Sequence, residues 1–225
     1  MLRLIFGCLV CVGLIENGRA VSVLPFTESF EANASGWVLG NSVAPTWVSN
    51  GGASGSAYIS GSASVIGTSF GTIVFRANAA NDASGDALVG NWLTTGVTLF
   101  SAYVRHNADV ALNFYARFDA GSGRAASSVN FLVNPNSWTL LELPITNATT
   151  SFQSYGAAGT GATAFNTILG GVQNVQIALA VDQANAGKTV TVDLDGVSMI
   201  PEPGVGALTA IASFVFLLGR RSRKV

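Results

Sequence analysis

The sequence contains few of the residues from which catalytic and metal centres are usually built. Its 225 residues include one histidine and two cysteines, and both cysteines, Cys8 and Cys11, lie in the apolar N-terminal segment. A zinc site draws its ligands mainly from histidine and cysteine, so the rest of the chain cannot complete one. The G-x-S-x-G motif at 67–71 is not followed by the helical pattern that a hydrolase nucleophile requires. We therefore expect a protein that is not an enzyme and has no cofactor.

Charge is also scarce, at 10% of the residues, and the formal net charge is −1. Proteins that bind nucleic acid carry a clear excess of basic residues, which is missing here, so we expect no nucleic-acid partner. Between residues 21 and 200, five basic residues stand against ten acidic ones. The resulting net charge disfavours anionic polymers as partners by charge alone.

The N-terminus has the pattern of a signal peptide. Arg3 precedes an apolar run over 4–15, and the small residues Gly18 and Ala20 follow. The run has the length of a signal-peptide core and is shorter than a membrane span. We predict a signal peptide over 1–20, cut by signal peptidase after Ala20, which leaves a mature chain without cysteine or disulfide. The alternatives are an uncleaved anchor or a first core strand.

The C-terminus combines a proline-flanked glutamate, an uncharged run over 204–219 and a basic tail over 220–225. A helix over that run would be about 24 Å long, a little short of the ~30 Å hydrocarbon core, and long arginine side chains can reach the interface. The positive-inside rule keeps the tail cytoplasmic, which agrees with the topology that the signal peptide sets. The basic residues of this tail are Arg220, Arg221, Arg223 and Lys224.

The order and terminal position of these parts resemble the PEP-CTERM protein-sorting signal, over residues 200–225. The resemblance implies a bacterial envelope and an exosortase that recognises Pro201, Glu202 and Pro203, with the basic tail stopping translocation. It implies an inner-membrane stage through the 204–219 helix, followed by cleavage and display at the cell surface or in the extracellular matrix. The prolines keep the motif extended, as a protease-like site requires. The alternative is a plain tail anchor with a proline-containing linker.

Strand patterns dominate the mature domain, which we place at 21–199. Apolar and polar residues alternate over 110–119 and again over 190–195, as in half-buried strands. Further strands are predicted at 97–106, 129–133, 138–143 and 172–181. No segment shows a sustained helical period, and residues 50–90 suggest short edge strands joined by long loops. The pattern predicts an all-β fold, a single antiparallel β-sandwich of jelly-roll type.

Two short segments of this domain resemble the ends of extracellular jelly-roll domains, which include carbohydrate-binding modules and adhesin-like domains. The opening is Phe26–Glu31 with Gly36-Trp37, and the closing strand is Asp193–Met199. In calcium-stabilised members, a ligand near the first strand meets one on the last strand. Glu31 and Asp195 match these positions, with Asp193 as a weaker third candidate. The alternative is that all three are solvent-facing strand residues.

The aromatic residues offer a second kind of site, because flat rings stack on the apolar faces of sugars. The alternative is that they pack between the sheets. We therefore expect an exported structural or adhesive surface protein that contacts exopolysaccharide. Other readings are a carbohydrate-binding module with a defined sugar site, which tryptophans on one concave sheet would favour, and a plain membrane-anchored envelope protein. The candidate platform residues are Trp37, Trp47, Trp92, Trp138, Tyr58, Tyr103, Tyr115 and Tyr155.

Overall fold

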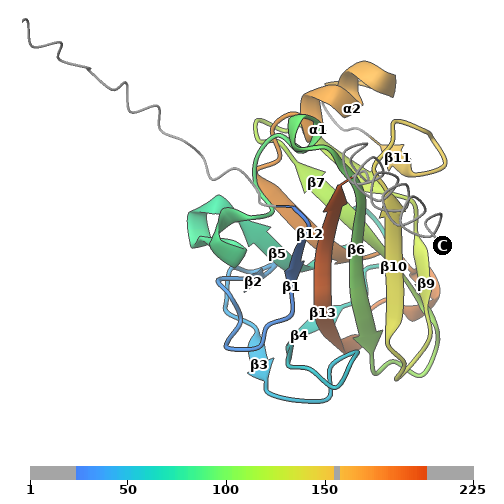
Figure 1. Ribbon diagram of the computed structural model, residues 1–225. Coiled ribbons are helices and arrows are strands. Elements are labelled where there is room, and N and C mark those ends of the chain that lie inside the picture. Colours follow the sequence, from blue (N-terminus) through green and yellow to red (C-terminus); the bar gives the residue numbers. More distant parts are fainter. Residues whose placement is uncertain (1–23, 155–157, 202–225) are drawn as a thin grey trace, which may run out of the picture.

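The computed structural model describes residues 24–154 and 158–201 (Figure 1). The predicted signal peptide, Glu202, Pro203, the 204–219 helix and the basic tail lie outside these residues. Within the described ranges, no helix is long and apolar enough to cross a membrane.

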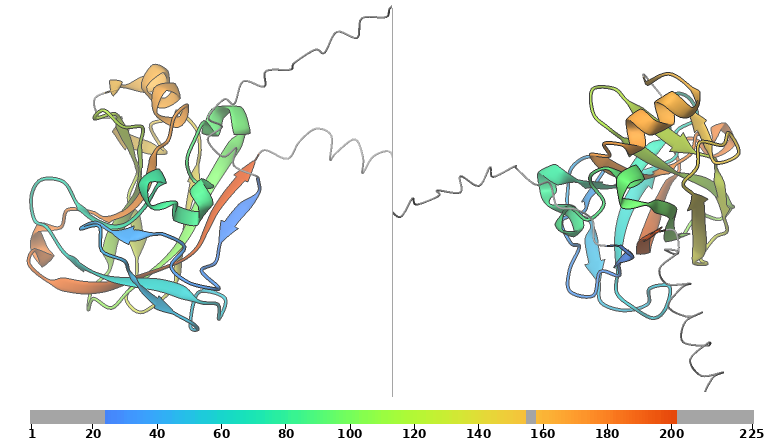
Figure 2. Two further views of the ribbon diagram at one scale, coloured as in Figure 1. Left: turned by 90° about the vertical axis from the view of Figure 1, so that its left-hand side faces the viewer. Right: turned by 45° about the horizontal axis from the view of Figure 1, so that its top comes forward.

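Two antiparallel sheets face each other, and Figure 2 shows them from two further directions. Sheet A runs in the order β10 (Thr139–Pro144), β6 (Val97–His106), β13 (Thr189–Pro201), β4 (Tyr58–Ser64), β3 (Thr46–Val48), and β1 (Phe26–Glu28) also pairs with β13. Sheet B runs in the order β11 (Phe152–Ser154), β8 (Ala125–Ser128), β7 (Leu112–Asp119), β12 (Asn174–Leu179), β5 (Thr72–Asn78), β2 (Val38–Leu39), and β9 (Phe131–Val133) also pairs with β7.

The connections are those of a jelly roll. Strands β4, β5, β6 and β7 alternate between the two sheets, and the later strands insert between them. The central orders become β4-β13-β6-β10 and β5-β12-β7-β8, the interleaved pattern of two Greek keys. The predicted antiparallel sandwich of jelly-roll type is confirmed. The predicted strand at 97–106 matches β6 at both ends.

The core lies between the sheets and is rich in aromatic rings. Trp92 starts the short helix α1 (Trp92–Thr95), which Asn91 caps by accepting hydrogen bonds from the amides of Leu93 and Thr94. The Trp92 ring stacks on Phe100 of sheet A at 5.9 Å and meets the Phe118 ring of sheet B edge-on at 5.0 Å. One buried tryptophan therefore joins both sheets at one end of the sandwich.

The structure corrects the expectation that no helix forms. Helix α2 spans Gly161–Leu169, and its buried side chains Ala164, Phe165, Ile168 and Leu169 form one helical face. This buried face is short, and the other residues of the helix are mostly glycine, alanine and threonine, so the helical period is hard to recognise in the sequence. The described residues also include the 3₁₀ segments η1 (Ala79–Asn81), η2 (Ala83–Asp86) and η4 (Gln183–Asn185).

The sequence predicted short edge strands over residues 50–90, but the structure forms two inner strands there. Strand β4 lies between β13 and β3, and β5 lies between β12 and β2. Alternation is weak in β4 because small residues fill inward positions, and a Cβ atom on Gly61 would overlap the Leu39 side chain. In β5 it is interrupted by a shift in the register with β12, which leaves both Val74 and Phe75 buried. The loop between them carries Ser69 of the G-x-S-x-G motif, which is exposed and leads into a strand instead of a helix.

His106, at the end of β6, is buried, with 1% of its surface exposed. Its Nε2 lies 2.9 Å from the Val133 carbonyl oxygen, its Nδ1 accepts a hydrogen bond from the Ala108 amide, and its ring stacks on Phe114. Because both ring nitrogens are engaged by the backbone, the histidine fastens the end of β6 to its neighbours.

Candidate binding site on the outer face of sheet B

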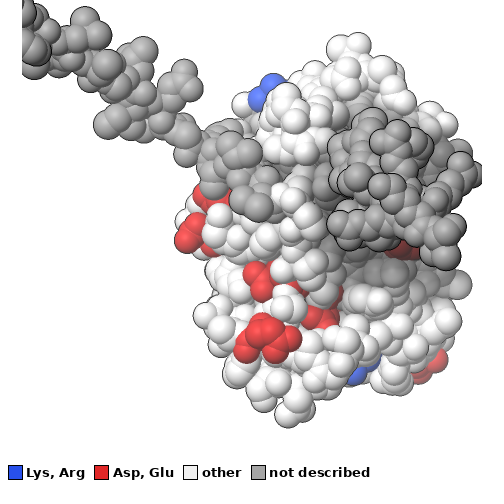
Figure 3. Space-filling model, viewed as in Figure 1, with Lys and Arg blue, Asp and Glu red and all other residues white. Residues whose placement is uncertain are grey.

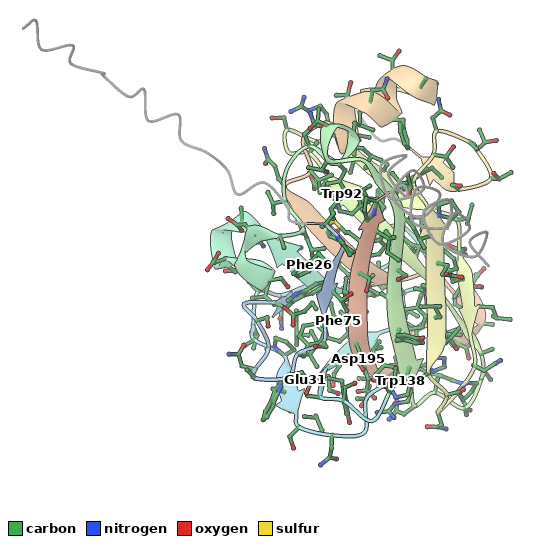
Figure 4. The ribbon with its side chains drawn as sticks, in the orientation of Figure 1. Phe26, Glu31, Phe75, Trp92, Trp138 and Asp195 are labelled. Carbon is green, nitrogen blue, oxygen red and sulfur yellow. The ribbon has the colours of Figure 1, made fainter. Side chains whose placement is uncertain are left out.

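The predicted calcium ligands have different surroundings in the structure (Figure 4). Glu31 is exposed, whereas Asp195 is only 2% exposed. Asp195 Oδ2 accepts hydrogen bonds from the Ala53 amide and the Ser56 hydroxyl at 2.8 and 2.7 Å, and its Oδ1 accepts one from Gly196. This carboxylate therefore holds the 51–56 loop against sheet A.

Asp193 is also buried on this face, so neither aspartate is a solvent-facing strand residue. Among the described residues, no group of three or more histidine, cysteine, aspartate or glutamate side chains could hold a metal. The calcium site at Glu31 and Asp195 stays a prediction.

The tryptophans do not form a platform on a concave sheet. Trp37 and Trp92 are buried between the sheets, and Trp47 donates a hydrogen bond to the Phe30 carbonyl. Trp138 packs with Tyr58 around the Arg105 guanidinium, which lies 4.4 and 5.0 Å from their ring centroids.

Arg105 also pairs with Asp193 at 2.8 Å. In this cluster on sheet A, Asp193 pairs with the Arg105 charge, and the guanidinium packs against both rings. The cluster therefore does not offer an open platform for a sugar. The nearby hollow of about 260 Å³ is lined by the same pair.

The outer face of sheet B carries a different arrangement, in which polar side chains align across three neighbouring strands. Gln176 of β12 is the register partner of both Arg76 in β5 and Arg117 in β7. In the next row on the same face, Asn174 is opposite both Asn78 and Asp119. Neighbouring strands are about 5 Å apart, so these side chains form a compact array. We call this set of six the polar array: Arg76, Asn78, Arg117, Asp119, Asn174 and Gln176.

Hydrogen bonds fix part of the polar array. Arg117 Nη1 donates to Gln176 Oε1 at 2.8 Å and lies 3.4 Å from Asp119 Oδ2. Asp119 Oδ1 in turn accepts from the Gly121 amide at 2.7 Å. Gln176 is 2% exposed, so the centre of the array is desolvated even though it lies on an outer face.

Other polar atoms of the array are left unsatisfied. Arg76 Nε and Asn174 Oδ1 are buried and have no hydrogen-bond partner among the described residues, where the third such atom is Asp86 Oδ1. Burying a polar atom without a partner costs free energy, so native proteins contain few of them and these often mark functional positions. The outer face of sheet B therefore carries one donor, Arg76 Nε, and one acceptor, Asn174 Oδ1, that a ligand could pair with.

Two hollows flank the array. One, of about 310 Å³, is lined by Asn78, Ala79, Ala80, Asp119, Gln173 and Asn174. The other, of about 280 Å³, contains two aromatic residues, and its lining is Ser69, Phe70, Gly71, Tyr115, Ser127, Asn130, Ala180 and Val181. Tyr115 and Arg117 are next neighbours on the outer face of β7, so this hollow continues directly from the array.

The hollow that contains Phe70 and Tyr115 is more apolar than the hollow that contains Asp119 and Asn174. Phe70 is 79% exposed, while Tyr115 packs with Ala178 and Ala180 in a small apolar cluster. Burial of Tyr115 raises the pKa of its phenol, and the charge on Arg117 opposes this shift. We refer to the array and its two hollows together as the sheet B site.

A larger hollow of about 500 Å³ lies beside β4 and β5, but its chemistry is plainer. Its lining contains no charged or aromatic side chain, and consists of Leu39, Gly40, Asn41, Ser62, Ala63, Ser64, Ile66, Gly71, Thr72 and Ile73. Volume alone therefore does not favour it over the sheet B site.

No protein-family model matches the sequence, and no curated protein is significantly similar to it. Among solved structures, the chain is similar to the C-terminal family 22 carbohydrate-binding module of Clostridium thermocellum xylanase 10B (14% identity, TM-score 0.48, 83% of this chain and 98% of that one). It is also similar to the family 11 carbohydrate-binding module of Clostridium thermocellum, in complex with a mixed-linked tetrasaccharide (14%, TM-score 0.44, 80% and 90%).

A third similar structure holds the N-terminal CBM22-1 and GH10 modules of the same xylanase with xylohexaose (18% identity, TM-score 0.47). There the match covers 79% of this chain and only 28% of the other. Carbohydrate-binding modules are thus among the structures that this chain resembles. All three TM-scores are below 0.5, and the likeness carries no argument about the site or the function.

Proposed function

We propose that the protein is a non-enzymatic, glycan-binding β-sandwich and that the sheet B site holds the glycan. The observation that carries this proposal is the polar array, in which guanidinium, amide and carboxylate groups lie on one face with two buried polar atoms unsatisfied. Sugar hydroxyls both donate and accept hydrogen bonds, so they can partner Arg76 Nε as well as Asn174 Oδ1.

The flanking hollows suit the same ligand. Phe70 and Tyr115 offer ring surface for the apolar C–H face of one sugar unit, and the hollow at Asp119 and Asn174 offers polar groups to another. A chain of sugars could therefore lie across the strands, with its hydroxyls over the array. We propose exopolysaccharide at the cell surface or in the matrix as the source of that glycan.

Substitutions in the site should separate binding from folding. We expect Tyr115→Ala or Arg117→Ala in the full-length chain, solubilised in detergent, to weaken retention in polysaccharide-containing gels by about tenfold or more, since each removes stacking or charge-assisted hydrogen bonds. The control is Glu142→Ala, at an exposed position on sheet A. If the two site variants migrate like the unsubstituted chain in every gel that retards it, the glycan lies elsewhere.

We also propose that the C-terminus acts as a PEP-CTERM sorting signal, which brings the domain to the surface through an exosortase. Strand β13 ends at Pro201, so the first residue of the tripeptide lies at the end of the last described strand. Glu202→Ala should leave export intact and trap an uncleaved form in the membrane, as measured by fractionation and intact mass in the native host. Unchanged processing would favour the plain tail anchor.

A further inference from the structure

Resting on the proposed glycan-binding function, we infer that the glycan carries an acidic sugar and that Arg76 binds its carboxylate. Arg76 is a member of the polar array and lies on β5, between β12 and β2, where it is the register partner of Gln176. Its guanidinium makes no hydrogen bond or ion pair with any residue in the described ranges, and its Nε is buried.

The other basic residues of the described domain all have partners. Arg105 and Arg117 pair with Asp193 and Asp119, and Lys188 pairs with Asp109. Arg124 donates to the carbonyl oxygens of Gly121 and Ala120. Within residues 24–154 and 158–201, Arg76 is therefore the one basic residue that has neither an ion pair nor a hydrogen bond from its side chain.

An unpaired guanidinium on a partly desolvated face suits an anionic ligand better than a hydroxyl. Its planar fork matches the two oxygens of a carboxylate, and charge-assisted hydrogen bonds are stronger than those to neutral groups. A sulfate ester shares this chemistry but is tetrahedral and fits the fork less closely. We therefore assign the carboxylate of a uronic acid or similar sugar acid to Arg76.

The surrounding charges place that acid at one position only. Asp119 lies in the next row and would repel a second carboxylate there, whereas Asn78 and Asn174 can accept hydroxyls. Over residues 21–200 the chain has five basic and ten acidic residues. Figure 3 shows the side of the molecule formed by sheet A, opposite the site, and red atoms predominate over blue ones there. The array therefore holds one acid group, at Arg76, and contacts the neighbouring sugar units through their hydroxyls.

The test compares paired polymers on the full-length chain in detergent. Polygalacturonate and its carboxyl-reduced form differ only in the acid group, and dextran sulfate and dextran form the matching sulfate pair. We expect the unsubstituted chain to bind polygalacturonate about tenfold more tightly than the reduced polymer, and Arg76→Gln to abolish that preference. Arg76→Lys should restore part of it. Arg124→Gln, which removes the arginine in the turn between β7 and β8, is the control and should keep the preference.

The outcomes separate this inference from the function on which it rests. If the chain binds both galacturonate polymers equally, and Arg76→Gln changes neither, the carboxylate assignment is wrong while glycan binding stands. A stronger preference for dextran sulfate would replace the carboxylate by a sulfate ester. If no polymer binds, or if binding ignores Tyr115→Ala and Arg117→Ala, the glycan-binding proposal itself fails. Unchanged thermal unfolding of Arg76→Gln would show that any loss comes from binding.

Discussion

At the scale of single residues, the buried ring of Trp92 stabilises the contact between the two sheets. Trp92 joins the two sheets, and its ring is fully buried against Phe100 and Phe118. We expect Trp92→Ala to lower the free energy of unfolding by about 3–5 kcal/mol, because a large cavity would remain. Urea unfolding measures this loss. Trp47→Ala is the matched control, since Trp47 is 39% exposed and should cost only about 1–2 kcal/mol. Equal losses would contradict the bridging role of Trp92.

Tyr115 belongs to the site, and its ionisation reports on that environment. Burial raises the pKa of its phenol above the ordinary value near 10. Its neutral form is therefore favoured in the folded state, so the stability that it contributes is present below pH ~10 and is lost as pH rises through the raised pKa. Ultraviolet titration should show one tyrosine that ionises late, and Tyr115→Phe should remove that step. A late step that survives the substitution would assign it to another tyrosine.

At the scale of elements, a single carboxylate positions the loop that covers sheet A. Asp195 accepts hydrogen bonds from Ala53 and Ser56, and Gly52 lies so close that a Cβ atom there would be 2.5 Å from Asp195 Oδ2. We expect Asp195→Ala to destabilise the fold by about 2–4 kcal/mol, because buried donors would lose their acceptor. Hydrogen exchange at the Ala53 amide should accelerate strongly, whereas Asp109→Asn, at an exposed ion pair, should leave it unchanged. Slow exchange in Asp195→Ala would show that other contacts hold the loop.

The elements also show what the sequence could reveal. The 97–106 prediction matches β6 at both ends, because this segment is rich in β-branched and aromatic side chains. The 110–119 prediction starts two residues before β7, and the 190–195 prediction covers only part of β13. Strand β4 was underestimated because Gly61 and neighbouring serines hide the period, and β5 because its register shift leaves both Val74 and Phe75 buried. The sheet B site was missed for another reason. Arg76, Arg117 and Gln176 become neighbours only through the pairing of strands that are far apart in the chain.

At the scale of the whole molecule, the sparse charge is unevenly used. Most basic side chains form internal ion pairs or hydrogen bonds, and among the described residues Arg76 is the one basic side chain without either. If Arg76 binds a carboxylate as proposed, the domain would take an anionic partner that its net charge disfavours, because binding depends on the local field at the site. The jelly-roll order places that site on the sheet opposite β1 and β13, the strands at which the described chain begins and ends.

Those two strands have a consequence for how the domain would be held. Strand β1 pairs antiparallel with the end of β13, with Phe26 opposite Met199, so the described chain enters and leaves at the same end of the sandwich (Figure 1). Should the predicted span at 204–219 cross the membrane, only Glu202 and Pro203 separate it from the last strand. The domain would then sit directly on the bilayer surface, because two residues cannot form a long flexible linker. The distance from the membrane at which it could bind a glycan would be limited by the height of the sandwich, for as long as the predicted span stays attached.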